Sequence, residues 1–371
     1  MVNRANKILI VTIILTIIGL YEVYSSSSVW ALYITGDSTY YFNKQLIFMI
    51  IGYFALFFFY KVNLDKIYKY DKFILLISFI LLVLVLIPGV SIVKNGSRSW
   101  IGTSFLSFQP SEIAKFALII FSSSYLSSTY KVSDKFLKST FWVLLVGGVS
   151  FLLIMLQPDF GSGMVILATL LIMTFTSRSK ISHYLYLGLI GVSGLAFLII
   201  IEPYRLDRII SYVDPFSDPL GSGFQIIQSL FALSPGGLIG NGIDGSIQKH
   251  FYLPEPQTDF IFAILCEEWG LIGGVLVLLL FLVFILNGLK VAKECKDLKK
   301  SYLAIGIVSV ISIQVIINLS VVVGLIPVTG ITLPFISYGG TSLIVTLALT
   351  GLLMNIAKKE VNNEIHISGR R

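Results

Sequence analysis

Apolar stretches approaching the length needed to cross a lipid bilayer recur along this 371-residue chain. A spanning helix needs about 20 mostly apolar residues, because the hydrocarbon layer is about 30 Å thick and each helical residue rises about 1.5 Å. Ten stretches approach this requirement: 8–24, 46–60, 73–88, 113–126, 140–156, 161–177, 184–201, 260–287, 302–326 and 341–357. Those at 46–60, 113–126 and 161–177 are short enough to leave a re-entrant helix open. The pattern predicts an all-α polytopic membrane protein with about ten transmembrane helices.

Composition and charge support a membrane protein with both termini on the cytoplasmic side. Hydrophobic residues make up 56% of the chain and charged residues 13%, which leaves too little polar cover for a soluble fold of this size. Most of the 27 Lys and Arg residues fall in alternate connections. Short cytoplasmic loops concentrate Lys and Arg, so this alternation orients the chain. Loops that face anionic lipid account for the net charge of +7, and nucleic-acid binding is not predicted.

The domain organisation follows from these spans. We expect one transmembrane domain over residues 1–371, with a short cytoplasmic tail at 358–371 and a large extracytoplasmic loop at 202–259. Loops longer than about 15 residues are usually functional or disordered. This loop is rich in apolar and aromatic residues and places Gly and Pro at turns, which predicts a compact cap with short helices.

The cap contains two polar pairs with helical spacing. Arg205 and Arg208 would share a helix face, and paired guanidinium groups suit a phosphate or pyrophosphate. Contact with lipid headgroups, or a salt bridge with Asp207, explains them equally well. Gln225 and Gln228 have the same spacing, which suits hydrogen bonds to a sugar but also ordinary helix packing.

Asp259 stands where the chain re-enters the membrane after the cap. Local rules favour a helix N-cap, in which the carboxylate accepts hydrogen bonds from the first amides of the eighth span. The same position suits a general base acting on the first sugar of a lipid-anchored substrate. Spacing alone leaves both roles open.

Charged residues at membrane depth form a second group of candidates, because each is costly unless paired. Glu112 and Lys115 are three residues apart, and Asp159 lies at a similar outer depth, so we expect a buried polar network. A pair that fixes helix packing and a direct substrate or proton-relay role both remain open. Glu267 and Glu268, near the start of the eighth span, suggest a polar cavity.

Two further outer segments are rich in Gly, Ser or Pro, namely 95–101 and 324–340, and we expect irregular backbone there, buried in protein or lining a wet cavity. Arg98 and Trp100 in the first segment would face phosphate and sugar, although an interfacial anchor also explains the Trp. The sequence contains no cluster with metal-ligand spacing, so no protein metal site is predicted.

The chain contains a set of motifs that together resemble one known family. They are Asn95-Gly96-Ser97-Arg98-Ser99-Trp100-Ile101, Gln109-Pro110-Ser111-Glu112, Gln157-Pro158-Asp159, the run 218–225, Gln228-Ser229, Leu253-Pro254-Glu255-Pro256, 258–262 and 327–340. From about residue 20 to residue 357 the chain resembles the SEDS family of shape, elongation, division and sporulation proteins (FtsW, RodA and SpoVE). The details are most similar to the SpoVE and FtsW branch of Gram-positive bacteria.

The resemblance implies ten spans in the bacterial cytoplasmic membrane and a peptidoglycan glycosyltransferase that polymerises lipid II into glycan strands. The family's candidate catalytic aspartate falls on Asp259. The implied reaction is inverting: Asp259 takes a proton from the GlcNAc 4-hydroxyl of the acceptor, which attacks C1 of MurNAc on the donor glycan. Arg98, Arg205, Arg208 and Lys249 would offset the charge of the leaving pyrophosphate, with or without Mg²⁺ or Mn²⁺. Implied partners are a class B penicillin-binding protein transpeptidase and divisome or elongasome proteins.

One residue departs from the family pattern. Many relatives carry His-Thr-Asp where this chain has Gln257-Thr258-Asp259, and Gln257 cannot act through charge. We interpret the difference as variation between branches. A lipid II flippase and a non-catalytic scaffold are the alternative functions. The long outer cap that ends in Asp259 favours an enzyme, because a flippase needs no single outer carboxylate at this boundary.

Overall fold

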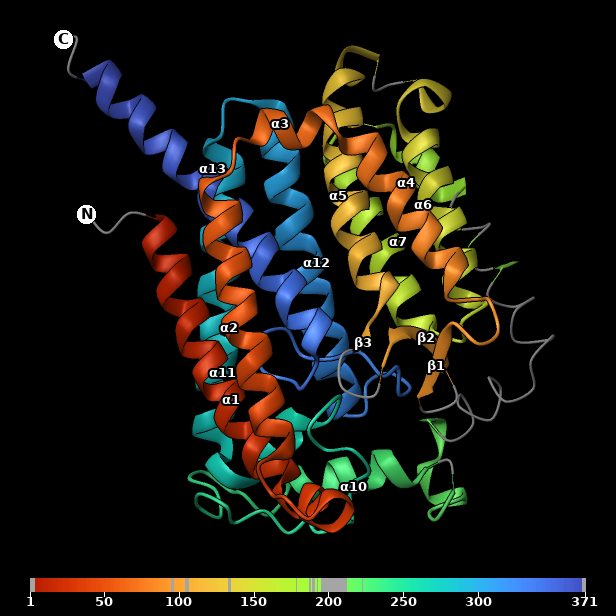
Figure 1. Ribbon diagram of the computed structural model, residues 1–371, viewed down its shortest axis with the longest axis vertical. Coiled ribbons are helices and arrows are strands. Elements are labelled where there is room, and N and C mark those ends of the chain that lie inside the picture. The colour runs from red at the N-terminus through yellow and green to blue at the C-terminus, as the bar shows by residue number, and fades with distance from the viewer. Residues whose placement is uncertain are drawn as a thin grey trace.

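A computed structural model of the chain describes residues 4–94, 97–103, 107–132, 135–177, 179–186, 188, 191, 193–194, 212–221 and 223–368. The helices form an elongated bundle with a small sheet at one end (Figure 1). In chain order the elements are α1 (Arg4–Thr35), α2 (Tyr40–Lys61), α3 (Leu64–Lys69), α4 (Asp71–Leu84), β1 (Ser91–Lys94), β2 (Ser97–Gly102), β3 (Ser107–Phe108), α5 (Pro110–Ser128), the 3₁₀ turns η1 (Tyr130–Val132) and η2 (Phe136–Lys138), α6 (Thr140–Met155), α7 (Phe160–Thr176), η3 (Pro215–Ser217), α10 (Phe224–Leu233), α11 (Ile261–Glu294), α12 (Leu298–Val322) and α13 (Gly340–Ser368).

The all-α polytopic class predicted from the sequence is confirmed. Within the described residues, each predicted span other than 184–201 coincides with a helix, and 184–201 lies mostly outside them. In the same part of the chain five helices are long and apolar enough to cross a membrane: α1, α2, α11, α12 and Gly340–Lys358 of α13. The count of ten spans stays a prediction.

Local sequence signals explain where several helices begin. Asn63 caps α3 by accepting a hydrogen bond from the Asp65 amide at 3.0 Å, and Asp297 caps α12 by accepting from the amides of Lys299 and Lys300. Pro110 opens α5, where its missing N–H costs nothing. Caps of this kind satisfy amides that have no partner inside the helix.

One end of the bundle carries the start of α1, α3 and the connection between α11 and α12 (Figure 1). An ion pair between Arg4 and Glu294 joins the start of α1 to the end of α11. At the same end the Asn355 side-chain amide donates to the carbonyls of Phe59 at 2.9 Å and Val62 at 2.7 Å, which fixes α13 to the end of α2. The sheet, α10 and the segment that leads into α11 lie at the opposite end.

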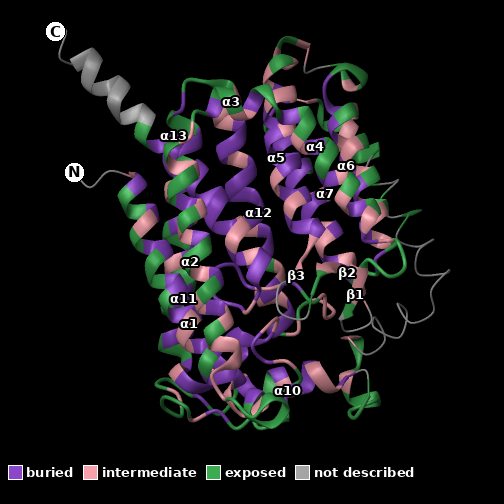
Figure 2. Ribbon diagram, viewed as in Figure 1, coloured by how far each residue is buried: buried purple, intermediate pink, exposed green. Residues whose placement is uncertain are grey.

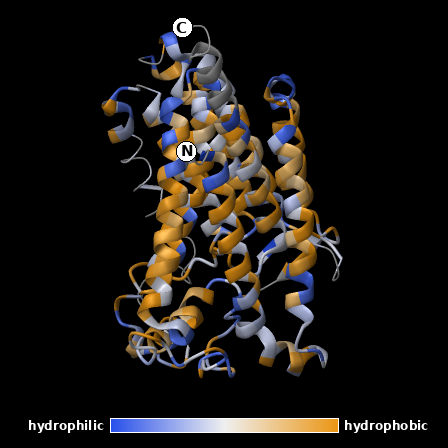
Figure 3. Ribbon diagram, turned by 90° about the vertical axis from the view of Figure 1, so that its left-hand side faces the viewer, coloured by the Kyte–Doolittle hydropathy of each residue, from blue (hydrophilic) through white to orange (hydrophobic). Residues whose placement is uncertain are grey.

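The surface of the bundle is apolar around its middle. Figure 3 shows hydrophobic residues along the length of the helices and hydrophilic residues toward both ends. Large apolar side chains point outward, for example Phe54 and Phe58 on α2 and Leu279 on α11. The central helices α12 and α13 are mostly buried (Figure 2). Extensive exposed apolar surface of this kind is unusual for a soluble protein and suits contact with lipid.

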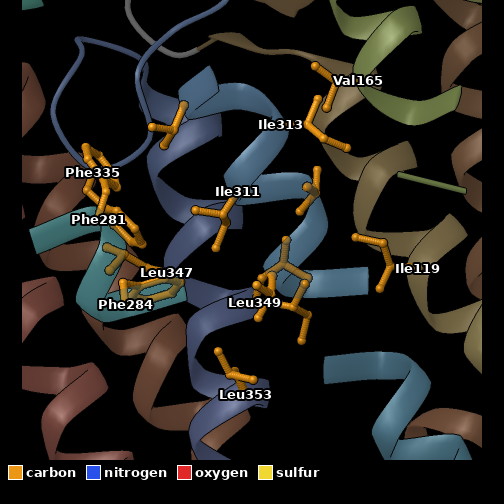
Figure 4. Close-up of a cluster of buried hydrophobic side chains, with 14 of the residues drawn as sticks. Ile119, Val165, Phe281, Phe284, Ile311, Ile313, Phe335, Leu347, Leu349 and Leu353 are labelled. Carbon is orange, nitrogen blue, oxygen red and sulfur yellow. The ribbon is translucent and has the colours of Figure 1, made fainter. Parts of the chain in front are cut away.

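The core lies where α5, α7, α11, α12 and α13 meet (Figure 4). It includes one residue from an irregular segment, Phe335, whose φ of 68° turns its ring to within 5.4 Å of the Phe284 ring of α11. Gly19 of α1 allows this approach, since a Cβ there would lie 2.5 Å from the Phe335 carbonyl oxygen. The segment 323–339 between α12 and α13 is therefore irregular, as expected, and packed inside protein.

The expectation of irregular backbone at 95–101 was wrong over most of that segment. β1 and β2 pair antiparallel, with Ile92 opposite Trp100, and β2 continues to β3, with Ile101 opposite Phe108. The Ser97 and Ser99 hydroxyls donate to the Gln157 carbonyl at 2.6 and 3.2 Å, which docks the sheet on the turn between α6 and α7. β-branched residues in β1 and β2 favour strands, and this signal was available in the sequence.

Candidate functional site

Asp259 lies in the turn that connects the cap to α11, at the end of the bundle opposite the start of α1. The helix begins at Ile261, and Phe260 occupies the N-cap position without a side-chain hydrogen bond. The favoured local expectation, that Asp259 caps this helix, was therefore wrong. Its Oδ1 instead accepts a hydrogen bond from the Thr258 hydroxyl at 2.7 Å, and the residue is partly exposed. The carboxylate is thus held in place and not sealed inside the core.

The backbone around Asp259 is fixed to the segment 323–339. The Asn318 side-chain amide donates to the Asp259 carbonyl at 2.7 Å and to the Ile331 carbonyl at 2.8 Å. The Tyr338 amide donates to the Gln257 carbonyl at 2.8 Å. Three hydrogen bonds therefore hold two irregular segments together, and the position of Asp259 depends on both.

Burial raises the pKa of Asp259 to about 6; the Thr258 hydrogen bond acts in the opposite direction, and the nearby Glu255 charge raises the pKa further. A general base works best when its pKa lies near the working pH. A carboxylate with a pKa of about 6 is ionised at neutral pH and accepts a proton more readily than an ordinary aspartate. Asp259 is thus suited to take a proton from a hydroxyl group.

A second polar cluster joins α5 and α7. Lys115 and Glu112 form a buried ion pair at 2.7 Å. Within the described part of the chain no salt bridge joins Asp159 to this pair, although its charge interacts with those of Lys115 and Glu112. Asp159 instead caps α7 by accepting from the Ser162 amide at 3.1 Å, and it accepts from the Gln109 side-chain amide at 2.9 Å. The charges at this depth are thus paired or hydrogen-bonded, as their cost requires.

The segment 323–339 and the first residues of α13 connect the Asp259 turn to the polar cluster around Asp159. On one side Ile331 shares the Asn318 amide with Asp259. On the other side Gly161 of α7 packs so closely on this segment that a Cβ would lie 2.7 Å from the Thr329 carbonyl oxygen. The Gln109 amide also donates to the Thr341 hydroxyl at 3.2 Å. The Asp259 turn and the start of α7 are therefore attached to one rigid piece of backbone.

The cap is inserted into a break in α11. Gly270 has φ 66° and ψ −166°, which interrupts the helix. The freed carbonyls of Glu267 and Glu268 accept from the amides of Asn241 and Gly242 at 3.0 and 3.1 Å. The amides of Leu271 and Ile272 donate to the carbonyls of Gly237 and Leu238 at 3.0 and 3.1 Å. The hydrogen bonds that the break removes are thus replaced by bonds to the cap.

The side chains of Glu267 and Glu268 also contact the cap, and the polar cavity expected around them stays a prediction. Glu267 accepts from the Ser246 hydroxyl at 2.5 Å and from the Ile247 amide at 2.9 Å. Glu268 accepts from the Ser25 hydroxyl of α1 at 2.6 Å and pairs with Lys249. These contacts join the cap to both α1 and α11.

Lys249 was expected to contact the pyrophosphate of the substrate, and its position contradicts this. The residue is 3% exposed, and its Nζ pairs with Glu268 at 3.1 Å and with Asp244. Its charge is already used inside the protein, so Lys249 belongs to the anchor of the cap.

Sequence reasoning missed Glu22 in the middle of α1. The residue is fully buried, and neither of its carboxylate oxygens has a hydrogen-bond partner. Electrostatically it faces Glu268 and Lys249. A charged residue in the first apolar stretch was visible in the sequence, and an intramembrane carboxylate always calls for an explanation.

The other predicted site residues lie on β2, on α10 or outside the described residues. Arg98 is exposed on β2, and Trp100 on the same strand is half-buried. Gln225 and Gln228 are half-buried on α10, where the Ser229 hydroxyl donates to the Val322 carbonyl at 2.8 Å. Arg205 and Arg208 lie outside the described residues. Within those residues, no group of three His, Cys, Asp or Glu side chains is arranged to hold a metal ion.

Comparison with known proteins shows the family to which the chain belongs. Residues 5–362 match the family described as "Cell cycle protein", the FtsW/RodA/SpoVE family. The chain belongs to this family. It is 52% identical to stage V sporulation protein E of Bacillus subtilis (strain 168) over 351 residues, which cover 95% of this chain and 96% of that protein.

Other members of the FtsW/RodA/SpoVE family are similar over the same length. The probable peptidoglycan glycosyltransferase FtsW of Geobacter sp. (strain M18) is 36% identical over 95% of this chain and 96% of its own. A solved chain described under structural coordination of polymerization and crosslinking by a peptidoglycan synthase complex aligns with a TM-score of 0.75 and 28% identity, covering 95% of this chain and 97% of that chain. The crystal structure of Thermus thermophilus RodA aligns with a TM-score of 0.69 and 25% identity, covering 95% and 96%. The chain is accordingly a multi-pass protein of the bacterial membrane.

Proposed function

We propose that this chain is a peptidoglycan glycosyltransferase that polymerises lipid II into β-1,4-linked glycan strands. The observation that carries the proposal is Asp259, a partly exposed residue whose carboxyl pKa is raised by burial to about 6 and whose backbone carbonyl accepts a hydrogen bond from Asn318. Full-length similarity to relatives named as glycosyltransferases supports the same reaction. Chemistry at this position needs the substrate to approach from the end of the bundle that carries the cap.

In the proposed reaction Asp259 accepts the proton of the GlcNAc 4-hydroxyl on the acceptor lipid II. The resulting oxygen attacks C1 of MurNAc at the end of the donor glycan. The bond from C1 to the pyrophosphate oxygen breaks, the configuration at C1 inverts, and undecaprenyl pyrophosphate leaves with the electron pair. A positioned base of this kind contributes about a hundred- to ten-thousand-fold in rate.

The leaving pyrophosphate needs positive charge near it. With Lys249 occupied in the cap, the remaining candidates are the exposed Arg98 and the pair Arg205 and Arg208. A divalent cation bound to the pyrophosphate would supply the same charge stabilisation.

The Glu112–Lys115 ion pair favours a structural role over a transport pathway. Each charge has a partner on the same helix, one turn away, and Asp159 is held by hydrogen bonds. Their neighbours Gln109 and Gly161 attach the start of α13 and the segment behind Asp259 to α5 and α7. We therefore assign these three residues to the scaffold of the site, where they support catalysis through position.

The proposal includes an orientation and a partner. Basic residues in α3 and in the connection between α11 and α12 lie at the same end as the start of α1, which supports a cytoplasmic location for both termini. A class B penicillin-binding protein is the proposed transpeptidase partner, because a structurally similar chain comes from a peptidoglycan synthase complex.

The proposal is tested by gel analysis of lipid II polymerisation with the purified protein in the presence of its partner. Asp259→Asn keeps the shape of the side chain and removes the base, so glycan products should be lost. Asp37→Asn is the matched control, because Asp37 is an exposed aspartate between α1 and α2 at the same end of the bundle. The control should polymerise lipid II like the wild type.

A further inference from the structure

Asn318 is a buried polar residue of α12 that is assigned to no step of the proposed reaction itself. Its side chain is 1% exposed, and its two amide hydrogens point to two different segments of the chain. One binds the Asp259 carbonyl at 2.7 Å and the other binds the Ile331 carbonyl at 2.8 Å. One nitrogen therefore joins the turn that carries the proposed base to the irregular segment behind it.

We propose that Asn318 is a positioning residue for glycosyl transfer, and that its amide holds the Asp259 turn in the geometry needed to accept a proton from the acceptor sugar. This inference rests on the proposed function, since it assigns Asn318 to the reaction that Asp259 performs.

The start of α11 explains why the Asp259 carbonyl needs an outside partner. The amides of Ala263 and Ile264 in the first turn both donate to the Phe260 carbonyl at 2.9 and 3.4 Å. The first carbonyl that the helix uses is thus that of Phe260, one residue after Asp259. Asn318 supplies the donor that the Asp259 carbonyl would otherwise lack, and a buried carbonyl without a donor is strongly disfavoured.

Together with the Asn318–Asp259 hydrogen bond, two further contacts restrict the position of the Asp259 carboxylate. The Tyr338 amide holds the Gln257 carbonyl at 2.8 Å, two residues before Asp259. The Thr258 hydroxyl, between them, holds Asp259 Oδ1. Fixing the backbone on both sides of Thr258 therefore fixes the carboxylate, and a displacement of about 1 Å at a reacting group can cost about a hundredfold in rate.

Asparagine suits this position for a chemical reason. The side-chain amide has two hydrogens on one nitrogen, so it donates to two carbonyls at once. Leucine has the same branched shape but is larger, and it donates to neither carbonyl. An ionised aspartate would direct a negative charge at both carbonyl oxygens. Substitutions at Asn318 therefore remove the connection without removing Asp259 or Thr258.

The chain contains a matched control at the other end of the bundle. Asn355 of α13 is 3% exposed, and its amide donates to the Phe59 and Val62 carbonyls at 2.9 and 2.7 Å. The burial and the two donated hydrogen bonds match those of Asn318, whereas the side-chain oxygen of Asn318 is in addition buried without a hydrogen-bond partner. Asn355 lies far from Asp259, near the start of α3, so its loss reports the purely structural cost of removing such a connection.

The experiment compares Asn318→Leu, Asn355→Leu, Asp259→Asn and the wild type as full chains, each purified with the transpeptidase partner. Initial rates of lipid II polymerisation are measured against lipid II concentration and pH, and thermal unfolding is followed in parallel. Both Leu variants should lower Tm to a similar extent. Only Asn318→Leu should lower kcat per folded protein, by roughly ten- to hundredfold, with KM little changed.

The pH profile gives a readout that lost stability alone would not move. When the Asp259 turn is released, water reaches the carboxylate more freely, so the midpoint of the acid limb should fall from about 6 toward the ordinary value of about 4. The charge of Glu255 also acts on Asp259. Glu255 is present in every variant, so the comparison between variants does not alter this interaction partner.

Two results would overturn the positioning role: equal losses of kcat in both Leu variants, or an Asn318→Leu profile with the midpoint and kcat of the wild type. The Asp259→Asn arm tests the proposed function separately. Full activity of Asp259→Asn would show that Asp259 is not the base. An inactive Asp259→Asn together with a wild-type profile in Asn318→Leu would overturn only the inference about Asn318.

Discussion

Lys249 and Glu268 form an ion pair inside the protein, with 3.1 Å between Nζ and Oε1 and side chains that are 1% and 0% exposed. Lys249 belongs to the cap, and Glu268 lies in α11 just before the break at Gly270. Ser25 of α1 contacts both charged groups, at 3.3 Å from the Lys249 Nζ and 2.6 Å from the Glu268 carboxylate. The pair therefore ties the cap to two helices, and the chain runs directly from this anchor to Asp259.

Replacing Lys249 with Met should destabilise the protein by about 3–5 kcal/mol, because it leaves Glu268 buried without its partner. Thermal or denaturant unfolding of the purified protein measures this loss. Lys300→Met is the control, since Lys300 forms a partly exposed pair with Asp297 at 2.8 Å, and such pairs contribute about 1 kcal/mol or less. Equal losses in the two variants would show that the cap does not depend on the buried pair.

Glu22→Gln should stabilise the protein. Both carboxylate oxygens of Glu22 are buried without a hydrogen-bond partner beside Glu268, so the charged form is costly, and Gln has nearly the same shape without the charge. The expected result is a higher Tm than that of the wild type. Glu268→Gln should have the opposite effect, because it removes a charge that Lys249 balances. A lower Tm for Glu22→Gln would contradict this account of α1.

Polymerisation should depend on pH through Asp259. The base works only when ionised, so the rate should fall as pH drops through about 6, where burial places its pKa. The raised pKa also has a cost: between about 4 and about 6 the unfolded chain loses this proton before the folded protein does, so stability decreases as pH rises through that window. Asp259→Asn should therefore be at least as stable as the wild type at neutral pH. Rates and Tm measured across this range check both statements.

The sequence predicted the parts of the fold that depend on nearby residues. Apolar runs located the spans, and Glu112 and Lys115 of the expected polar network are buried and paired, although with each other on one helix and not between helices. The residue types of Asn63 and Pro110 match the positions that begin α3 and α5. Interactions of this kind are made within one or two turns, so a local pattern contains the information.

Contacts between distant segments were not predictable in the same way. The capping rule failed at Asp259 because Asn318, 59 residues away, supplies the donor for its carbonyl. Lys249 was assigned to a substrate, whereas its charge is paired with Asp244 and Glu268, and Ser25, 224 residues earlier in the chain, contacts it as well. The local signal for the break in α11 is only the glycine at position 270, and the lost hydrogen bonds are replaced by residues 237–242 of the cap. In each case a tertiary partner decided the role of the residue.

The most direct test of the central claim is the initial rate of lipid II polymerisation by Asp259→Asn at neutral pH, compared with the wild type in the same purified complex. If Asp259 is the base, the polymerisation rate should fall by at least about a hundredfold, with Tm equal to or above that of the wild type. A folded Asp259→Asn protein that extends glycan strands at the wild-type rate would contradict it.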